Sequence, residues 1–152
     1  MARPLTEQER QEFLAEPHVG VLSVTGETGR PPLAMPTWYA YHQGGMLSFF
    51  TGTQGRKARK IELIQKAGMV SLTVQREEFP YKYVTVEGAV INAEQPPSAE
   101  HMLAIARRYL PEEAAQAFVA AELARPGSTL VLFTVRPDRW WTGDFSEDAG
   151  NP

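Results

Sequence analysis

The sequence predicts a mainly β protein: a six-stranded antiparallel barrel, closed or partly closed, with helices packed around it. About six segments are apolar or β-branched, and short turns separate most of them, so consecutive segments are expected to be antiparallel neighbours. Three or four further segments have helical features, and two of these stand together before the last strand. The 152 residues fit one domain, 1–152, in which 137–152 form a C-terminal tail.

The first half of the chain predicts one helix and three strands. Thr6 and Glu9 have the spacing of a capping box, which starts a short helix that ends near Ala15. Pro36 cannot donate a hydrogen bond within a sheet, so it marks a bulge or an edge position. The strands expected here, joined by glycine-containing turns, are His18–Thr25, Pro32–His42 and Met46–Gly52.

The second half predicts three strands and three helices. The elements expected are a basic helix to about Lys66, strands Met69–Gln75 and Tyr81–Ala93, helices Ser98–Leu110 and Glu112–Leu123, and a strand Ser128–Val135. Gly88 is expected at a bulge or bend. From Arg136 the chain is expected to be irregular. Trp140 and Trp141 cannot easily both be core there, so we expect a place at an interface or over a ligand.

Composition narrows the class of function. The net charge is −3, which does not favour binding to nucleic acid or to an anionic membrane. No apolar run approaches the roughly 20 residues that span a bilayer. The absence of cysteine excludes disulfides and thiolate metal sites and fits a reducing compartment. The charged segment Arg3–Glu12 does not have the pattern of a secretory signal, so we expect a cytoplasmic protein.

A cluster of cations at the expected start of the basic helix is the strongest functional signal. Arg56, Lys57, Arg59 and Lys60 follow a glycine-containing loop. Helix starts carry a partial positive charge, so an exposed cation there costs about 0.3–1 kcal/mol. Unpaired N–H groups, glycine and cations together are typical of an anion site, most simply for a phosphate. The alternative is a solvated basic helix face.

Signals for other kinds of site are weak. His18, His42 and His101 lie in three separate elements without the spacing of metal ligands, so we expect no metal site. No spacing of side chains indicates a catalytic acid, base or nucleophile, and the catalytic residues stay unknown. Nucleic-acid binding through the small basic cluster is not expected of an acidic chain. An anion site with aromatic neighbours remains.

Aromatic residues gather on the strands next to this cluster. Trp38 and Tyr39 lie on the strand expected to pair with Met46–Gly52, which itself carries Phe49 and Phe50. Such surroundings suit a flat heterocycle that carries a phosphate. The alternative is that these rings belong to the core.

The order and spacing of these segments are similar to a known family. The stretch Met46–Ile61, an aromatic strand ending in Thr, a small-residue loop, Arg-Lys and a helix, is followed by the strand Gly68–Val74 and by Lys82–Gly88, which closes with Glu-Gly. Together they resemble the pyridoxamine 5′-phosphate oxidase-like superfamily, whose split β-barrels bind FMN or the deazaflavin F420. The resemblance extends over about residues 5–142. It implies a split barrel of the FMN-binding type.

The resemblance also implies a set of cofactor contacts. The cofactor ring is implied to lie against Met35, Pro36, Thr37 and Trp38. The ribityl chain is implied to lie between Phe50, Thr51 and Gly52, and the phosphate on Arg56 and Lys57. Lys60, with Arg59, suits the acidic tail of F420. Members of the family are usually homodimers with the cofactors at the subunit interface, where Trp141 or Trp140 is implied to approach the partner's cofactor.

Two departures direct the functional expectation. Gly55 stands where the pyridoxamine phosphate oxidases have Ser before Arg-Lys, and their Arg-rich substrate-binding segment is not recognisable in 136–152. The resemblance therefore favours a small F420-dependent oxidoreductase that transfers a hydride to or from a small organic substrate. One alternative is an FMN-dependent oxidoreductase of the same family. Another is a carrier that binds a flavin-type or haem-like ligand without turnover.

Overall fold

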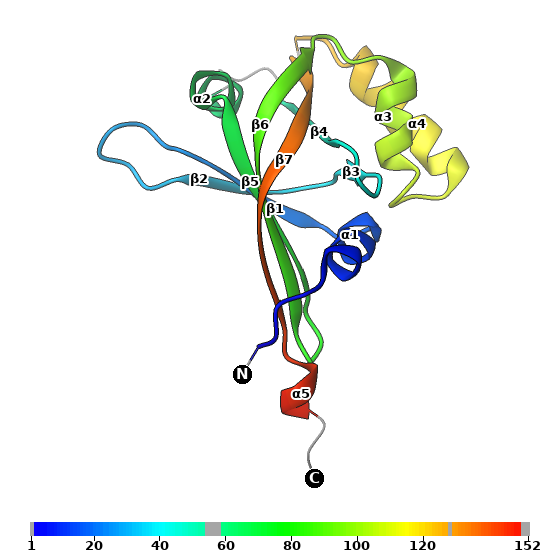
Figure 1. Cartoon of the computed structure of the whole chain (residues 1–152). Helices are drawn as coiled ribbons and strands as arrows, with labels where there is room; N and C mark the ends of the chain where they lie inside the picture. Colours follow the sequence, from blue (N-terminus) through cyan, green and yellow to red (C-terminus); the bar gives the residue numbers. More distant parts are fainter. Residues whose placement is uncertain (1, 54–58, 128, 150–152) are drawn as a thin grey trace.

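A computed structural model describes residues 2–53, 59–127 and 129–149. Its centre is one antiparallel sheet with the strand order β2-β1-β5-β6-β7-β4-β3 (Figure 1). The strands are β1 (Gly20–Val24), β2 (Leu33–Thr37), β3 (Ala40–Tyr41), β4 (Leu47–Gly52), β5 (Met69–Arg76), β6 (Lys82–Glu94) and β7 (Leu130–Asp144). The predicted mainly β fold with flanking helices is confirmed. The described sheet has seven strands rather than six, because the second expected strand divides into β2 and β3.

Helices flank the sheet on several sides. They are α1 (Glu7–Ala15), α2 (Arg59–Ala67), α3 (Ala99–Ala106), α4 (Glu112–Ala124) and α5 (Ser146–Ala149). The capping box of Thr6 and Glu9 is present, and the Ser98 hydroxyl accepts a hydrogen bond from the His101 amide at the start of α3. Figure 1 shows α3 and α4 together beside β3 and β4, well away from α2. No helix in the described ranges is long and apolar enough to cross a membrane.

The division of the second strand has a cause in tertiary contacts. The Tyr39 side chain is fully buried, and its hydroxyl donates to the Leu14 carbonyl at 2.6 Å. The Tyr39 amide donates to the Tyr109 hydroxyl at 3.1 Å instead of to a neighbouring strand. The chain therefore leaves β2 after Thr37 and pairs with β4 only from Ala40. β2 and β3, consecutive in sequence, stand at opposite ends of the strand order.

The expectation of an irregular segment from Arg136 is wrong, because β7 continues to Asp144 and pairs along most of β6. The register shifts after Glu87, which confirms the bulge expected at Gly88. A Cβ atom at Gly88 would collide with the Arg136 carbonyl oxygen, so the strands approach too closely there for a side chain. The segment was missed because its polar and proline-containing sequence forms a strand only through long-range pairing with β6.

Two hydrophobic clusters hold these elements. The larger one fills the inside of the curved sheet, under α1 and α2, and includes Leu14, Leu22, Phe49, Leu72 and Phe133. The smaller one lies between the α3–α4 pair and the sheet, and includes Met102, Ile105, Val119 and Leu132. β4 borders both clusters, because Phe49 points into the first and Phe50 packs against the second. This position places β4 at the site described next.

Candidate cofactor-binding site

The site begins with a gap in the barrel between β2 and β4. β2 pairs only with β1, and β4 beyond Ser48 pairs only with β7, among the strands of the described ranges. The two strands contact each other across the gap without forming a ladder. Each presents an edge with backbone donors and acceptors that the described sheet does not use. β2 stands at the end of the strand order, which confirms the edge position predicted for Pro36.

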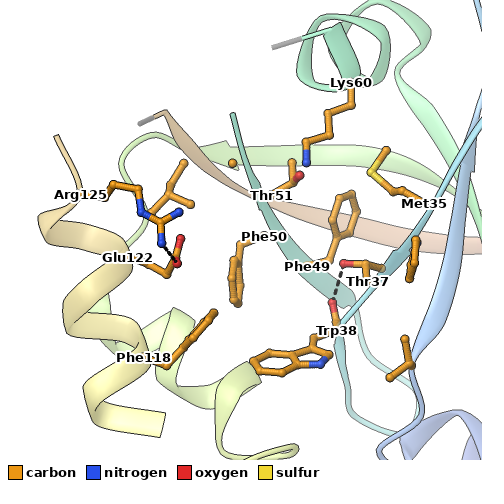
Figure 2. Close-up of a pocket in the computed structure, with 14 residues that line it drawn as sticks. Met35, Thr37, Trp38, Phe49, Phe50, Thr51, Lys60, Phe118, Glu122 and Arg125 are labelled. Atoms are coloured by element: carbon orange, nitrogen blue, oxygen red, sulfur yellow. Dashed lines mark hydrogen bonds and ion pairs between the residues drawn. The ribbon is translucent and has the colours of Figure 1, made fainter. Parts of the chain in front are cut away.

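A pocket of about 370 Å³ occupies this gap (Figure 2). Its size lies in the range typical of small-molecule sites. Eight residues expected at the cofactor line it: Met35, Pro36, Thr37, Trp38, Phe50, Thr51, Gly52 and Lys60. A Cβ atom at Gly52 would lie only 2.8 Å from the Leu130 side chain, so a larger residue here would require that side chain to shift. Residues far apart in sequence thus meet in one cavity with two strand edges.

The cations of the basic cluster have different surroundings. Arg56 and Lys57 lie outside the described residues. Arg59 forms ion pairs with Glu27 and Glu62 and does not line the pocket. Lys60 does line it, and burial lowers the pKa of its ammonium group. Among the ion pairs of the described ranges none involves Lys60. A partly desolvated ammonium group beside the Thr51 hydroxyl fits an anion such as a phosphate (Figure 2).

Aromatic rings form one wall of the pocket. Trp38 stacks on Tyr109, with ring centroids 4.9 Å apart and planes 6° from parallel. The Tyr109 hydroxyl donates to the His18 carbonyl at 2.8 Å, which fixes the ring behind Trp38. Phe118 lies 5.2 Å from Trp38 and 6.2 Å from Phe50, measured between centroids. This wall offers flat apolar surface to a heterocyclic ring.

Six further residues line the pocket that sequence reasoning had not assigned to the site: Val19, Phe49, Phe118, Glu122, Arg125 and Leu130. Phe118 and Glu122 are spaced i, i+4 on α4, and Arg125 follows as the C-cap residue of this helix. That spacing is visible in the sequence, but nothing in it indicates that this face turns toward β4. Arg125 donates to Glu122 at 2.8 Å along this face (Figure 2).

Trp141 lies elsewhere on the chain. It does not line this pocket, and 56% of its surface is exposed. Its indole N–H donates to Glu87 at 2.6 Å on the outer face of the sheet. Trp140 points the other way, where it packs edge-on against Tyr41 and lies under the Arg10 guanidinium. Successive side chains of a strand point to opposite faces of the sheet, which explains why the adjacent Trp140 and Trp141 have different surroundings. The contact of Trp141 with a partner's cofactor stays a prediction.

Comparisons with known proteins agree with this geometry. The sequence profile of the family described as pyridoxamine 5′-phosphate oxidase matches residues 6–142. A solved F420 reductase is 25% identical, with a TM-score of 0.66 over 86% of this chain and 94% of the other. A conserved hypothetical protein of Mycobacterium tuberculosis is 20% identical, with a TM-score of 0.63 over 97% of this chain and 89% of the other.

An FAD-binding protein of Mesorhizobium loti is 22% identical, with a TM-score of 0.59 over 94% of this chain and 95% of the other. No protein with a curated description matches the sequence. The profile match extends over most of the chain, from the capping box of α1 through β7. The chain belongs to the pyridoxamine 5′-phosphate oxidase family of split β-barrels.

Proposed function

We propose that this chain is an oxidoreductase that uses F420 and transfers a hydride between the bound cofactor and a small organic substrate. The observation that carries the proposal is the pocket in the gap between β2 and β4, with a partly buried cation at Lys60 and an aromatic wall at Trp38. The family itself contains flavin- and deazaflavin-type oxidoreductases. We place the reaction in the cytoplasm, because the reducing chemistry of such oxidoreductases and the cysteine-free composition both suit that compartment.

The residues of the pocket have distinct roles in this proposal. Lys60, together with Arg56 and Lys57, holds the anionic end of the cofactor by charged hydrogen bonds. The edges of β2 and β4 hydrogen-bond the ring through their backbone groups, and Trp38 covers it and excludes water. F420, when bound, supplies the hydride chemistry, and the protein supplies orientation.

The choice of F420 over FMN is supported by one solved structure and by two departures in the sequence. A solved F420 reductase is 25% identical and aligns over most of both chains. Gly55 stands in place of the serine of the pyridoxamine phosphate oxidases, and their Arg-rich substrate-binding segment is not recognisable in 136–152. FMN stays the alternative cofactor of the same proposal, since the phosphate site suits both.

A homodimer is also part of the proposal. One row of residues crosses five strands on the outer face of the sheet: Pro36, Val21, Thr73, Thr85 and Trp141. Val21 and Trp141 are 44% and 56% exposed, and Thr73 lies at the centre of the row. A twofold axis that runs along β5 exchanges the two ends of the row. It brings the partner's Trp141 over Pro36, at the edge of the cofactor pocket.

Reoxidation of the reduced cofactor tests the reaction. The chain is loaded with F420 or FMN, the cofactor is reduced, and a water-soluble quinone is added under anaerobic conditions. An oxidoreductase is expected to return the cofactor spectrum to its oxidised form faster than free cofactor does. A reduced cofactor that stays unreactive while bound would instead identify the chain as a carrier without turnover.

A further inference from the structure

We infer that the α4 side of the pocket is the substrate subsite and that it takes a neutral, planar aromatic molecule with a polar substituent. The inference rests on the proposed function, whose substrate it specifies. It starts from Phe118 and Glu122 of α4 and from Arg125 at its C-cap, which line the pocket opposite β4 (Figure 2). The sequence had not assigned any of the three to the site.

Ring geometry indicates an aromatic ligand. Phe118 and Phe50 are both partly buried, and their planes are tilted by 45° with centroids 6.2 Å apart. Trp38 stacks on Tyr109, and its ring also lies 5.2 Å from that of Phe118, measured between centroids. Three rings from β4, α4 and the segment after β2 thus border the same space. An aromatic ligand can add offset-stacked or edge-on contacts to such rings, which are favourable beyond the burial of area alone.

Charge separates this subsite from the cofactor's anionic end. The Glu122 side chain is only 18% exposed, and its carboxylate forms an ion pair with Arg125 at 2.8 Å. The pair contributes no net charge, and its carboxylate disfavours a phosphate or an acidic tail close to it. Lys60 has no such counter-charge among the described ion pairs. The α4 side therefore suits an uncharged group, such as a carboxamide, that both donates and accepts hydrogen bonds.

The test uses the full chain and three matched probes. Cofactor affinity is measured first by calorimetric titration with F420 and FMN. The cofactor-loaded chain is then titrated with 2-naphthamide, with 2-naphthoate, which is anionic, and with cyclohexanecarboxamide, which is not aromatic. We expect 2-naphthamide to bind at least tenfold more tightly than either other probe.

Three variants assign that preference to α4. Phe118→Ala is expected to raise the Kd of 2-naphthamide at least tenfold and to change the cofactor Kd by a smaller factor. Leu123→Ala, exposed on the same helix and outside the pocket, is the control and should change neither. Glu122→Gln leaves Arg125 without this carboxylate and should shift the ratio of affinities at least fivefold toward 2-naphthoate.

The outcomes separate the two proposals. A chain that binds neither cofactor refutes the proposed function before any probe is added. Cofactor binding without preference among the probes refutes the substrate subsite alone. A Phe118→Ala chain that loses cofactor while 2-naphthamide still binds would assign α4 to the cofactor and overturn the inference. If that variant does not fold, the charge shift in Glu122→Gln and the wild-type preference decide.

Discussion

Neighbouring residues of identical charge have different roles in this chain. Arg59 and Lys60 are adjacent cations at the start of the described part of α2. Arg59 pairs with Glu27 and Glu62 on the surface, whereas Lys60 reaches the pocket and is partly desolvated. The sequence predicts a basic cluster beside the strand that ends at Gly52. Only the orientation of the helix in the structure shows which of the two cations lines the pocket.

Lys60→Met tests this assignment, since it removes the charge and keeps most of the apolar stem. We expect it to weaken F420 or FMN binding by about 1.5–3 kcal/mol, the usual contribution of a hydrogen bond to a charged group. Arg59→Met is the matched control and should leave the affinity within about 0.5 kcal/mol, because surface pairs contribute little. Fluorescence titration of both variants measures the difference. Equal losses in the two would assign the phosphate to the whole helix face.

Tyr109→Phe tests how Trp38 is held. The ring that stacks on Trp38 remains, but the buried Tyr39 amide loses its hydrogen-bond acceptor. We expect a loss of about 1–3 kcal/mol in the free energy of unfolding, measured by urea denaturation. Tyr81→Phe, on a half-exposed ring, serves as the control and should be nearly neutral. Wild-type stability in Tyr109→Phe would show that this hydroxyl network is not needed.

Local patterns predicted most elements, and long-range contacts decided the rest. The capping box of Thr6 and the alternation of β5 specify their elements with nearby residues alone, and both are confirmed. The break at Trp38 and the extension of β7 depend on Tyr109 and on pairing with β6, which lie far away in sequence. For the same reason most pocket residues on β2 and β4 could be predicted from the sequence, whereas those on α4 could not.

A group of hydrogen bonds, here called the clasp, joins Arg3 and Glu9 near the N-terminus to Asp144 at the end of β7. Arg3 donates to both Glu9 oxygens and to Asp144, each at 3.0 Å, and its backbone pairs with that of Asp144. Hydrogen bonds from Arg3 lower the pKa of Glu9 from its ordinary 4.5 to about 2. The pKa of Asp144 is also lowered, first by its hydrogen bond with Ser146. The clasp joins the start of α1 to the end of β7.

Arg3→Gln tests the clasp through its pH dependence. A carboxylate with a depressed pKa in the folded state stabilises the fold above its unfolded pKa and loses this effect as pH falls through its folded pKa. The wild type should therefore be more stable than Arg3→Gln at pH 7, and the difference should vanish between about pH 4.5 and pH 2. Urea denaturation at pH 7, 4 and 2.5 measures it. A difference that persists unchanged at pH 2.5 would show that Arg3 acts by packing instead.

The molecule as a whole is an incomplete barrel that leaves a gap between two strands and an exposed apolar face on the outside of the sheet. The gap between β2 and β4 forms the pocket, and the outer face of β1, β5, β6 and β7 exposes large apolar side chains such as Met69 and Trp141. Exposed apolar surface of this kind typically marks an interface. In the proposed dimer a partner copy would cover this face and extend the wall of the pocket at Pro36.

Val21→Glu tests the assembly. Val21 lies in the row between Pro36 and Thr73, so a carboxylate there would be buried against the partner without a counter-charge. We expect sedimentation velocity to show a dimer for the wild type and a monomer for Val21→Glu at micromolar concentration. Leu123→Glu, exposed on α4 away from this face, should stay dimeric. A wild-type monomer at all concentrations would contradict the proposed dimer and the contact of Trp141 with the partner's cofactor.

The central claim is that the gap between β2 and β4 holds a phosphate-bearing flavin or deazaflavin. Titration of the purified apo-protein with F420 and with FMN, followed by cofactor fluorescence, tests it most directly. We expect saturable binding at micromolar protein, tighter for F420 than for FMN, that weakens in Lys60→Met and in Lys57→Ala. Binding of neither cofactor under these conditions would contradict it.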